Sequence, residues 1–312
     1  MPNLNINTLA ALPAEAQIFY DKNLLAVAEP ECAYRRHAQK TKVPKNGGTS
    51  VNWRDMKKLG LSTSPLSEGI VPDGDKLNIV PISADIASYG NYITTTDRID
   101  LMAIDKVVMH AVKRLGLQAA ESLDFLAGSE FCTGTNAIFA GGKNSRNALG
   151  SGDVISLNNI LMAAQKLKAN AAPKIDGTYF GIIHPAVAYD LMKIADDNNC
   201  WVDVSKYSAH EKIEKGEIGK LYGVRFIETP NAISVESDSG LVYQTLIYGD
   251  DAFGCVDLEG GNLRTIVKPL GSAGSADPLD MIATVGWKAF DACKLLNNDN
   301  VIRIESMSEF AV

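Results

Sequence analysis

The feature that most constrains the fold is a long amphipathic stretch between Thr96 and Gly128. Apolar side chains recur there every three or four residues, at Leu101, Ile104, Val108, Ala111, Leu115, Ala119, Leu123 and Leu126. This spacing places one apolar stripe on one face of an α-helix. Thr96 suits the N-cap and Gly128 the C-terminal stop. At 1.5 Å per residue the helix spans roughly 45 Å, which predicts a strut on which other elements dock.

The segment before this helix has the alternation of β-strands. Thr49–Trp53 alternates, residues 61–75 are rich in Gly, Pro, Ser and acid, and residues 76–82 and 84–95 alternate again. The pattern predicts a long-tipped hairpin over residues 41–95, with little apolar content and no platform within its own chain. Because an isolated two-stranded hairpin is marginal in water, we expect it to lie on a partner subunit.

The rest of the chain mixes helix and strand. Ser156 is suited to cap a helix over Leu157–Ala171, and the buried strand Thr178–Ile183 leads through His184-Pro185 into a helix that runs to Ile194. Further strands are expected at Val224–Glu228, Leu241–Tyr248, Leu263–Lys268, Met281–Lys288 and Val301–Glu305.

Composition narrows the function. The chain has 312 residues and a net charge of -7, which argues against general affinity for nucleic acid. Its 5 cysteines are widely spaced, without a CxxC pair or a histidine cluster, so reduced thiols are expected rather than a zinc site or a disulfide framework. The chain lacks a signal-peptide start and any apolar run of 18 residues, so no membrane association is expected.

A basic patch follows the first 30 residues. Two interpretations remain. One is a contact with nucleic acid, and the other is a solvated arm or a contact with an acidic neighbour; the acidic remainder of the chain favours the second. The patch consists of Arg35, Arg36, His37, Lys40, Lys42 and Lys45.

Some residues could serve an enzyme. The glycine-rich loop 132–152 fails the spacing of a phosphate loop. His184 could be a catalytic base, although a capping or packing role is favoured. Asp250 and Asp251 could hold magnesium, although acids at a helix start are the favoured interpretation. With Asp190 these are the candidates of an enzyme hypothesis that we do not favour, and we predict no catalytic residue, no cofactor and no metal.

Several stretches together resemble one branch of the coat proteins of tailed bacteriophages. They are Tyr89-Gly90-Asn91 leading to Thr95-Thr96-Asp97; Gly216–Gly219 followed by Gly223–Thr229; Tyr248-Gly249 with Ala252-Phe253-Gly254; and Asp277-Pro278-Leu279 leading to Val285–Lys288. The order of elements also resembles the major capsid protein fold, which tailed bacteriophages share with encapsulins and the floor of herpesvirus capsids.

The resemblance implies an α+β fold with an N-terminal arm (1–40), an extended β-hairpin loop (41–95), a peripheral domain with a long spine helix (96–172 and 264–312) and an axial domain (173–263). It implies a structural protein that self-assembles into hexamers and pentamers of an icosahedral shell around packaged double-stranded DNA. The expected location is the virion capsid, assembled in the host cell cytoplasm, and portal, scaffold and decoration proteins are the expected partners. Because the arm and loop fill residues 1–95, a separate scaffold is expected. The alternatives are an encapsulin-like nanocompartment shell or, less favoured, a soluble α/β enzyme.

The hairpin supplies the expected contacts between subunits. Charges at an interface fix register and partner choice, although each exposed pair contributes only about 0–1 kcal/mol. The residues predicted for inter-subunit assembly are Trp53, Arg54, Lys57, Lys58, Glu68, Asp73, Asp75 and Lys76.

Overall fold

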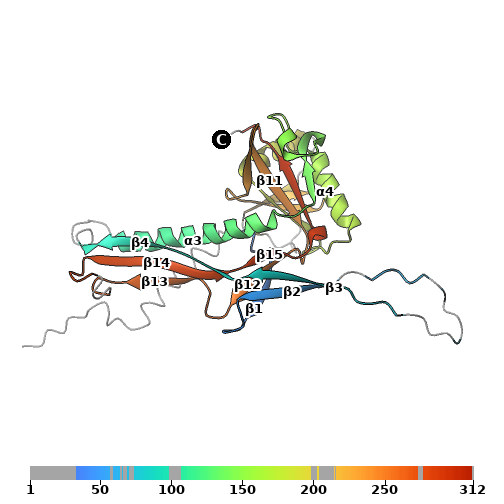
Figure 1. Ribbon diagram of the computed structural model, residues 1–312. Coiled ribbons are helices and arrows are strands. Elements are labelled where there is room, and N and C mark those ends of the chain that lie inside the picture. Colours follow the sequence, from blue (N-terminus) through green and yellow to red (C-terminus); the bar gives the residue numbers. More distant parts are fainter. Residues whose placement is uncertain are drawn as a thin grey trace, which may run out of the picture.

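The structure is a computed structural model that describes residues 33–56, 59–63, 65, 69, 74–97, 107–197, 202–203, 214, 216–272 and 277–310. Its architecture is α+β, as expected. Figure 1 shows a long flat wing, an α/β body that stands at one end of the wing, and a hairpin that projects on the other side of the body. Among the described residues, no helix has the length and apolar character needed to span a membrane.

The wing consists of the helix α3 (Val107–Phe131) on an antiparallel sheet of β4 (Ala87–Thr96), β14 (Ile282–Asp291) and β13 (Arg264–Lys268), with β14 in the centre (Figure 1). Of the predicted apolar stripe, Ala111, Leu115, Ala119 and Leu123 are buried as expected, whereas Leu126 is only half-buried. The side chains that form this core are Val112, Leu115, Ala119 and Leu123 of α3 and Val285, Trp287 and Ala289 of β14.

The structure tests the predicted C-terminal end of this helix but not its predicted start. The predicted start at Thr96 adjoins residues 98–106, which lie outside the described residues, as do Leu101 and Ile104. The predicted stop at Gly128 is wrong, because α3 continues to Phe131. Gly128 instead gives room for an aromatic ring, since a Cβ atom there would lie 2.8 Å from the Tyr34 ring.

The body is built on one mixed sheet with the strand order β5-β16-β11-β6-β9-β8-β7, and β10 pairs with β11. These strands are β5 (Ala137–Phe139), β6 (Tyr179–Ile183), β7 (Val202–Asp203), β8 (Glu217–Leu221), β9 (Val224–Glu228), β10 (Ser234–Ser237), β11 (Gly240–Tyr248) and β16 (Val301–Ser306). All of β6 is buried. Because successive side chains point to opposite faces, Tyr179 and Ile183 join one core while Phe180 and Ile182 join the other.

The helices α4 (Leu157–Ala169) and α5 (Pro185–Asp197) belong to the first of these cores. The predicted cap is confirmed, because the Ser156 hydroxyl accepts a hydrogen bond from the Asn159 N–H at 3.3 Å. The helix α4 ends before the predicted Ala171, whose φ of 54° takes the backbone out of the right-handed helix. Short 3₁₀ turns occupy Ala140–Gly142, Arg146–Ala148 and Asn298–Asn300.

The strands β5 and β16 belong to the body sheet. Both strands fall in residues assigned to the peripheral domain (96–172 and 264–312), yet they pair with each other, and β16 pairs with β11 of the axial segment 173–263. A strand buried within a continuous sheet belongs to the core of that sheet. The wing proper is therefore the smaller unit of α3, β4, β13 and β14.

A small sheet joins wing, body and hairpin. It has the order β1 (Gln39–Val43), β12 (Phe253–Leu258), β15 (Cys293–Leu295), and the base of the hairpin, β2 (Ser50–Met56) paired with β3 (Ile79–Asp85), packs against it. The buried side chains of this junction are Val43, Val51, Trp53, Val256 and Ala292. The expectation that residues 41–95 find no platform in their own chain is therefore wrong for the hairpin base, and also for β4, which pairs with β14.

Candidate assembly site

The residues predicted for assembly are distributed along the hairpin from its base outward. Trp53 lies at the base with 8% of its surface exposed, and its indole N–H donates to the Thr41 hydroxyl at 2.8 Å. A Cβ atom at Gly254 would lie 3.0 Å from the Trp53 ring, so glycine permits this close packing. Trp53 thus anchors the hairpin base to its own chain.

The charged members of the predicted set lie farther out. Arg54, Asp75 and Lys76 are exposed to solvent. Lys57, Lys58, Glu68 and Asp73 lie outside the described residues.

Sequence reasoning missed the exposed apolar side chains of the hairpin. Their exposed fractions are high for apolar residues: Met56 60%, Leu59 49%, Leu61 86%, Leu77 54%, Ile79 43% and Val80 38%. A concentration of exposed apolar side chains on one projecting element is typical of a surface that a partner covers. The sequence does contain this signal, in Leu59, Leu61 and Leu77. These leucines lie beside or within residues 61–75, whose Gly, Pro and Ser content predicts an irregular tip rather than an apolar surface.

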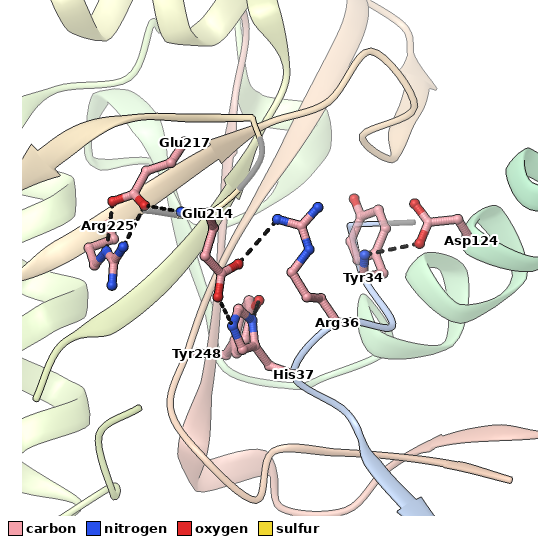
Figure 2. Close-up of polar contacts among 8 residues, drawn as sticks. All are labelled: Tyr34, Arg36, His37, Asp124, Glu214, Glu217, Arg225 and Tyr248. Atoms are coloured by element: carbon pink, nitrogen blue, oxygen red, sulfur yellow. Dashed lines mark hydrogen bonds and ion pairs between the residues drawn. The ribbon is translucent and has the colours of Figure 1, made fainter. Parts of the chain in front are cut away.

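A second segment, the arm segment 33–43, is bound within the chain; its residues 33–38 form bends and turns, and Gln39–Val43 is a strand. Tyr34 is fully buried, and its backbone N–H donates to the Asp124 carboxylate of α3 at 3.0 Å (Figure 2). Its hydroxyl accepts from the backbone N–H of Ile233 at 3.1 Å. Burial raises the pKa of Tyr34 well above its ordinary value, and it also raises the pKa of Asp124. Tyr34 therefore connects the spine helix to the body.

The next residue connects the arm to the wing. Arg35 donates to both carboxylate oxygens of Asp291, at 2.9 and 3.2 Å, where β14 ends. Such a bidentate pair fixes the geometry of both side chains. Burial raises the pKa of Asp291, and the Arg35 charge opposes that shift.

Arg36 and His37 meet at one carboxylate, Glu214 (Figure 2). Arg36 donates to Glu214 at 3.1 Å. The His37 Nε2 atom lies 2.8 Å from the other oxygen, and because a carboxylate only accepts, this nitrogen carries the proton. Its Nδ1 atom is hydrogen-bonded to the Tyr248 hydroxyl at 2.9 Å. Burial alone would raise the pKa of Glu214, but the hydrogen bonds and charges of His37 and Arg36 outweigh it and lower that pKa.

A buried ion pair between Arg225 and Glu217 holds the backbone of Glu214 in place. Arg225 of β9 binds Glu217 through two hydrogen bonds of 2.5 and 2.6 Å, and both side chains are almost fully buried. The Glu217 carboxylate also accepts from the backbone N–H of Glu214 at 3.0 Å. Arg36 and His37 of the arm segment thus bind a carboxylate, Glu214, whose backbone is already held in place by Glu217 of the body.

These contacts show which partner part of the basic patch binds. Arg35, Arg36 and His37 bind acidic side chains of their own chain, which confirms the predicted contact with an acidic neighbour for these three residues. Lys40, Lys42 and Lys45 are exposed, so both interpretations remain for them.

Comparison with solved structures decides the fold. The chain superposes on the capsid of Ralstonia phage GP4 with a TM-score of 0.72 and 14% identity, covering 91% of this chain and 93% of that chain. The capsid of cyanophage P-SCSP1u gives a TM-score of 0.65 and 14% identity, with 89% of each chain covered. The chain has the major capsid protein fold. No protein-family model and no curated protein sequence matches it.

A third match of the same fold is a virus-like particle from Pyrococcus furiosus, with a TM-score of 0.55, 14% identity, and 93% of this chain and 99% of that chain covered. In each comparison the coverage is nearly complete on both sides. The major capsid protein fold therefore accounts for the hairpin and the wing as well as for the body.

Within this fold the enzyme candidates do not meet. His184 follows β6 and Asp250 follows β11, which is antiparallel to β6, so they lie at opposite ends of neighbouring strands, roughly 20 Å apart at 3.3 Å per residue. The His184 Nδ1 atom accepts from the Ala186 N–H at 3.1 Å and the ring stacks on Tyr243, which confirms the capping and packing role. Burial lowers the pKa of His184.

The acidic candidates have structural places as well. The Asp190 carboxylate is buried and accepts from the Glu309 N–H at 3.2 Å. Asp250 and Asp251 form a turn between β11 and β12, so the predicted helix start is wrong; Asp251 has a φ of 54°, which suits a tight turn. The described residues include no cluster of three or more His, Cys, Asp or Glu that could hold a metal ion.

Proposed function

We propose that the chain is a structural major capsid protein that self-assembles into the hexamers and pentamers of an icosahedral shell around packaged phage DNA. The observation that carries the proposal is the projecting hairpin with its exposed apolar outer part, on a fold that spans phage capsids almost end to end. A small-molecule enzyme has little use for a hairpin that projects beyond its own domain.

The hairpin contacts a neighbouring copy. Fully burying a Leu or Ile side chain contributes about 1.5–3 kcal/mol, so covering Leu61, Leu77 and Ile79 would supply most of the affinity of one contact. The exposed charges of Arg54, Asp75 and Lys76 then select register rather than supply affinity, because exposed pairs contribute little. Head-to-tail contacts of this kind close into rings when the rotation permits.

The parts of the chain take the roles that the resemblance implies. Residues 1–40 are the arm, the β2–β3 hairpin is the extended loop, the wing is the core of the peripheral domain, and the body sheet is the axial domain. The arm segment fastens the wing to the body through Asp124, Asp291 and Glu214. A subunit held in this way presents its hairpin in a fixed direction.

The proposed partners are other copies of the chain, with portal, scaffold and decoration proteins, and the location is the virion capsid after assembly in the host cytoplasm. The net charge of -7 would limit adhesion of the packaged DNA to the inner wall. A titration of the full chain with double-stranded DNA tests this point. We expect weak binding, and tight, salt-sensitive binding would contradict it.

Electron microscopy tests the proposed function itself. The purified full chain, expressed with and without its candidate scaffold, should form rings, tubes or closed shells in negative stain. A chain in which Leu61 and Leu77 are both replaced by Ser should remain as single subunits. Small discrete particles of the unaltered chain at high concentration would overturn the proposal.

An encapsulin-like nanocompartment is the second candidate, favoured by the match to the Pyrococcus furiosus virus-like particle. It uses the same contacts and differs in content. Shells recovered from the native source should hold double-stranded DNA under the first proposal and a protein cargo under the second, and nuclease-protected DNA of uniform length distinguishes them.

A further inference from the structure

Two cysteines face each other in the small sheet that joins wing and body. Cys255 of β12 lies directly opposite Cys293 of the antiparallel strand β15. The Val256 N–H donates to the Ala292 carbonyl at 2.9 Å, and the Leu296 N–H donates to the Ala252 carbonyl at 2.9 Å. This pattern makes Cys255 and Cys293 a non-hydrogen-bonded pair, the arrangement that brings Cα atoms to about 4.5 Å and side chains closest together.

That spacing falls in the range that a disulfide requires, about 4.4–6.8 Å between Cα atoms. The two sulfur atoms lie side by side, 2.6 Å apart, and are not bonded to each other. The backbone therefore needs no movement for a bond to form. Sequence spacing alone indicated no pairing, because the two residues lie 38 positions apart and only the strand register brings them together.

The two cysteines differ in exposure. Cys293 is half-buried and lines a surface groove with Glu130, Ser129 and Asp85. Cys255 lines a second groove but has only 2% of its surface exposed. An oxidant therefore meets the more exposed Cys293 first, and Cys255 is placed to resolve the product.

We propose that Cys255 and Cys293 form an oxidisable cross-strand pair whose disulfide ties together the two strands that connect the wing to the body. In exchange with glutathione disulfide, the Cys293 thiolate attacks one glutathione sulfur and releases the other as a thiolate. The Cys255 thiolate then attacks the Cys293 sulfur of the mixed disulfide, forms the Cys255–Cys293 bond and releases the second glutathione. The pair loses two electrons to the glutathione disulfide, and its two protons pass through solvent to the released thiolates.

The residues around Cys293 make thiol–disulfide exchange at this pair slow. The hydrogen bond with Cys255, burial and the nearby Asp291 carboxylate raise the pKa of Cys293, while the Arg35 charge opposes them. A raised pKa leaves little thiolate at neutral pH, so exchange is slow. A pair of this kind suits a lasting link rather than a catalytic cycle.

The position of the link determines its effect. The chain crosses from body to wing through β12, between β11 and β13, and returns through β15, between β14 and β16. A Cys255–Cys293 bond ties these two crossings together at the junction. This part rests on the proposed function: a shell assembled in a reducing cytoplasm would gain the link after release into oxidising surroundings.

The test uses the full chain incubated with glutathione disulfide, then digested and mapped by mass spectrometry without reduction. We expect a cross-linked peptide that joins Cys255 to Cys293 within one chain. Free thiols at both positions after prolonged oxidation of the folded protein, stable glutathione adducts, or links between chains would overturn the proposal.

Thermal unfolding measures the effect of the link. Oxidation should raise the Tm by about 5–10 °C, and reduction should reverse the shift. The shift should vanish in Cys293→Ala and Cys255→Ala but persist in the control Cys132→Ser, whose buried thiol lies outside the pair. An unchanged shift in Cys293→Ala would contradict the assignment. Reduced protein should still assemble, so failure of the link and failure of the shell are seen separately.

Discussion

The arm segment 33–43 and the β2–β3 hairpin are both rich in charge, yet they are bound in different ways. Arg35, Arg36 and His37 find acidic partners within the chain, and Tyr34 is fully buried. Along the hairpin the exposed fraction instead rises outward, from 8% at Trp53 to 60% at Met56 and 86% at Leu61. Charge therefore does not distinguish the contact within the chain from the proposed assembly surface. Of the two segments, only the hairpin carries large exposed apolar side chains.

The strongest way to break the internal contact is Tyr34→Ala. Removing a fully buried aromatic side chain should lower the free energy of unfolding by about 3–5 kcal/mol, because the ring packs on Gly128 and leaves a cavity when lost. Chemical denaturation of the unassembled chain measures it. The control Tyr34→Phe keeps the ring and loses only the bond from Ile233, so a loss of about 1–2 kcal/mol is expected. Equal losses in the two variants would show that the ring does not hold the arm.

The hairpin should respond in the opposite sense. Replacing Leu61 and Leu77 with Ser should change the free energy of unfolding by less than about 0.5 kcal/mol, because both side chains are exposed. Assembly should be lost, since each buried leucine contributes about 1.5–3 kcal/mol to a contact. Light scattering measures assembly. The control Leu161→Ser, on the exposed face of α4 in the body, should assemble normally. Assembly of the hairpin variant at unaltered concentration would refute its role.

Acid should weaken the arm contact selectively. The pKa of Glu214 is lowered in the folded state, so its contribution is present above the unfolded value near 4.5 and is lost as pH falls through the folded value. Glu214→Gln should therefore lose about 1 kcal/mol of stability at neutral pH, and this loss should shrink as the pH falls below 4.5 through the lowered pKa of the folded state. Asp124 and Asp291 have raised pKa values, so their contributions run in the opposite direction. Unfolding curves across pH separate the two, and a stability difference that stays constant with pH would contradict the role of Glu214.

The smallest effect is expected at the hairpin charges. Arg54→Ala and Lys76→Ala should each change the contact by about 0–1 kcal/mol, because exposed ion pairs are screened. Assembly measured against salt concentration should show a shallower dependence in the variants. A complete loss of assembly in either one would mean that charge, rather than apolar area, supplies the contact.

The sequence predicts elements with strong periodicity well. The strand Val224–Glu228 has the predicted bounds, Ser156 caps α4, and Ala111, Leu115, Ala119 and Leu123 lie on the buried face of α3. These features depend on local spacing, which one sequence contains.

The features that sequence did not predict depend on contacts between distant residues. Gly128 reads as a helix stop, and only the packing of Tyr34 explains it inside α3. Asp124 is an acid within an apolar stripe, a local signal whose partner lies 90 residues away. The strand β16 pairs with β5 and β11, and strand order of this kind does not follow from periodicity.

The central claim is that the hairpin rests on a neighbouring copy. A mixture of light and 15N-labelled full-length chains, assembled together and cross-linked through lysine, tests it most directly at Lys76, which is exposed on the hairpin. Cross-links from Lys76 should join light to heavy chains in the assembled material and disappear when Leu61 and Leu77 are replaced by Ser. Cross-links from Lys76 confined to single chains in assembled particles would contradict the account.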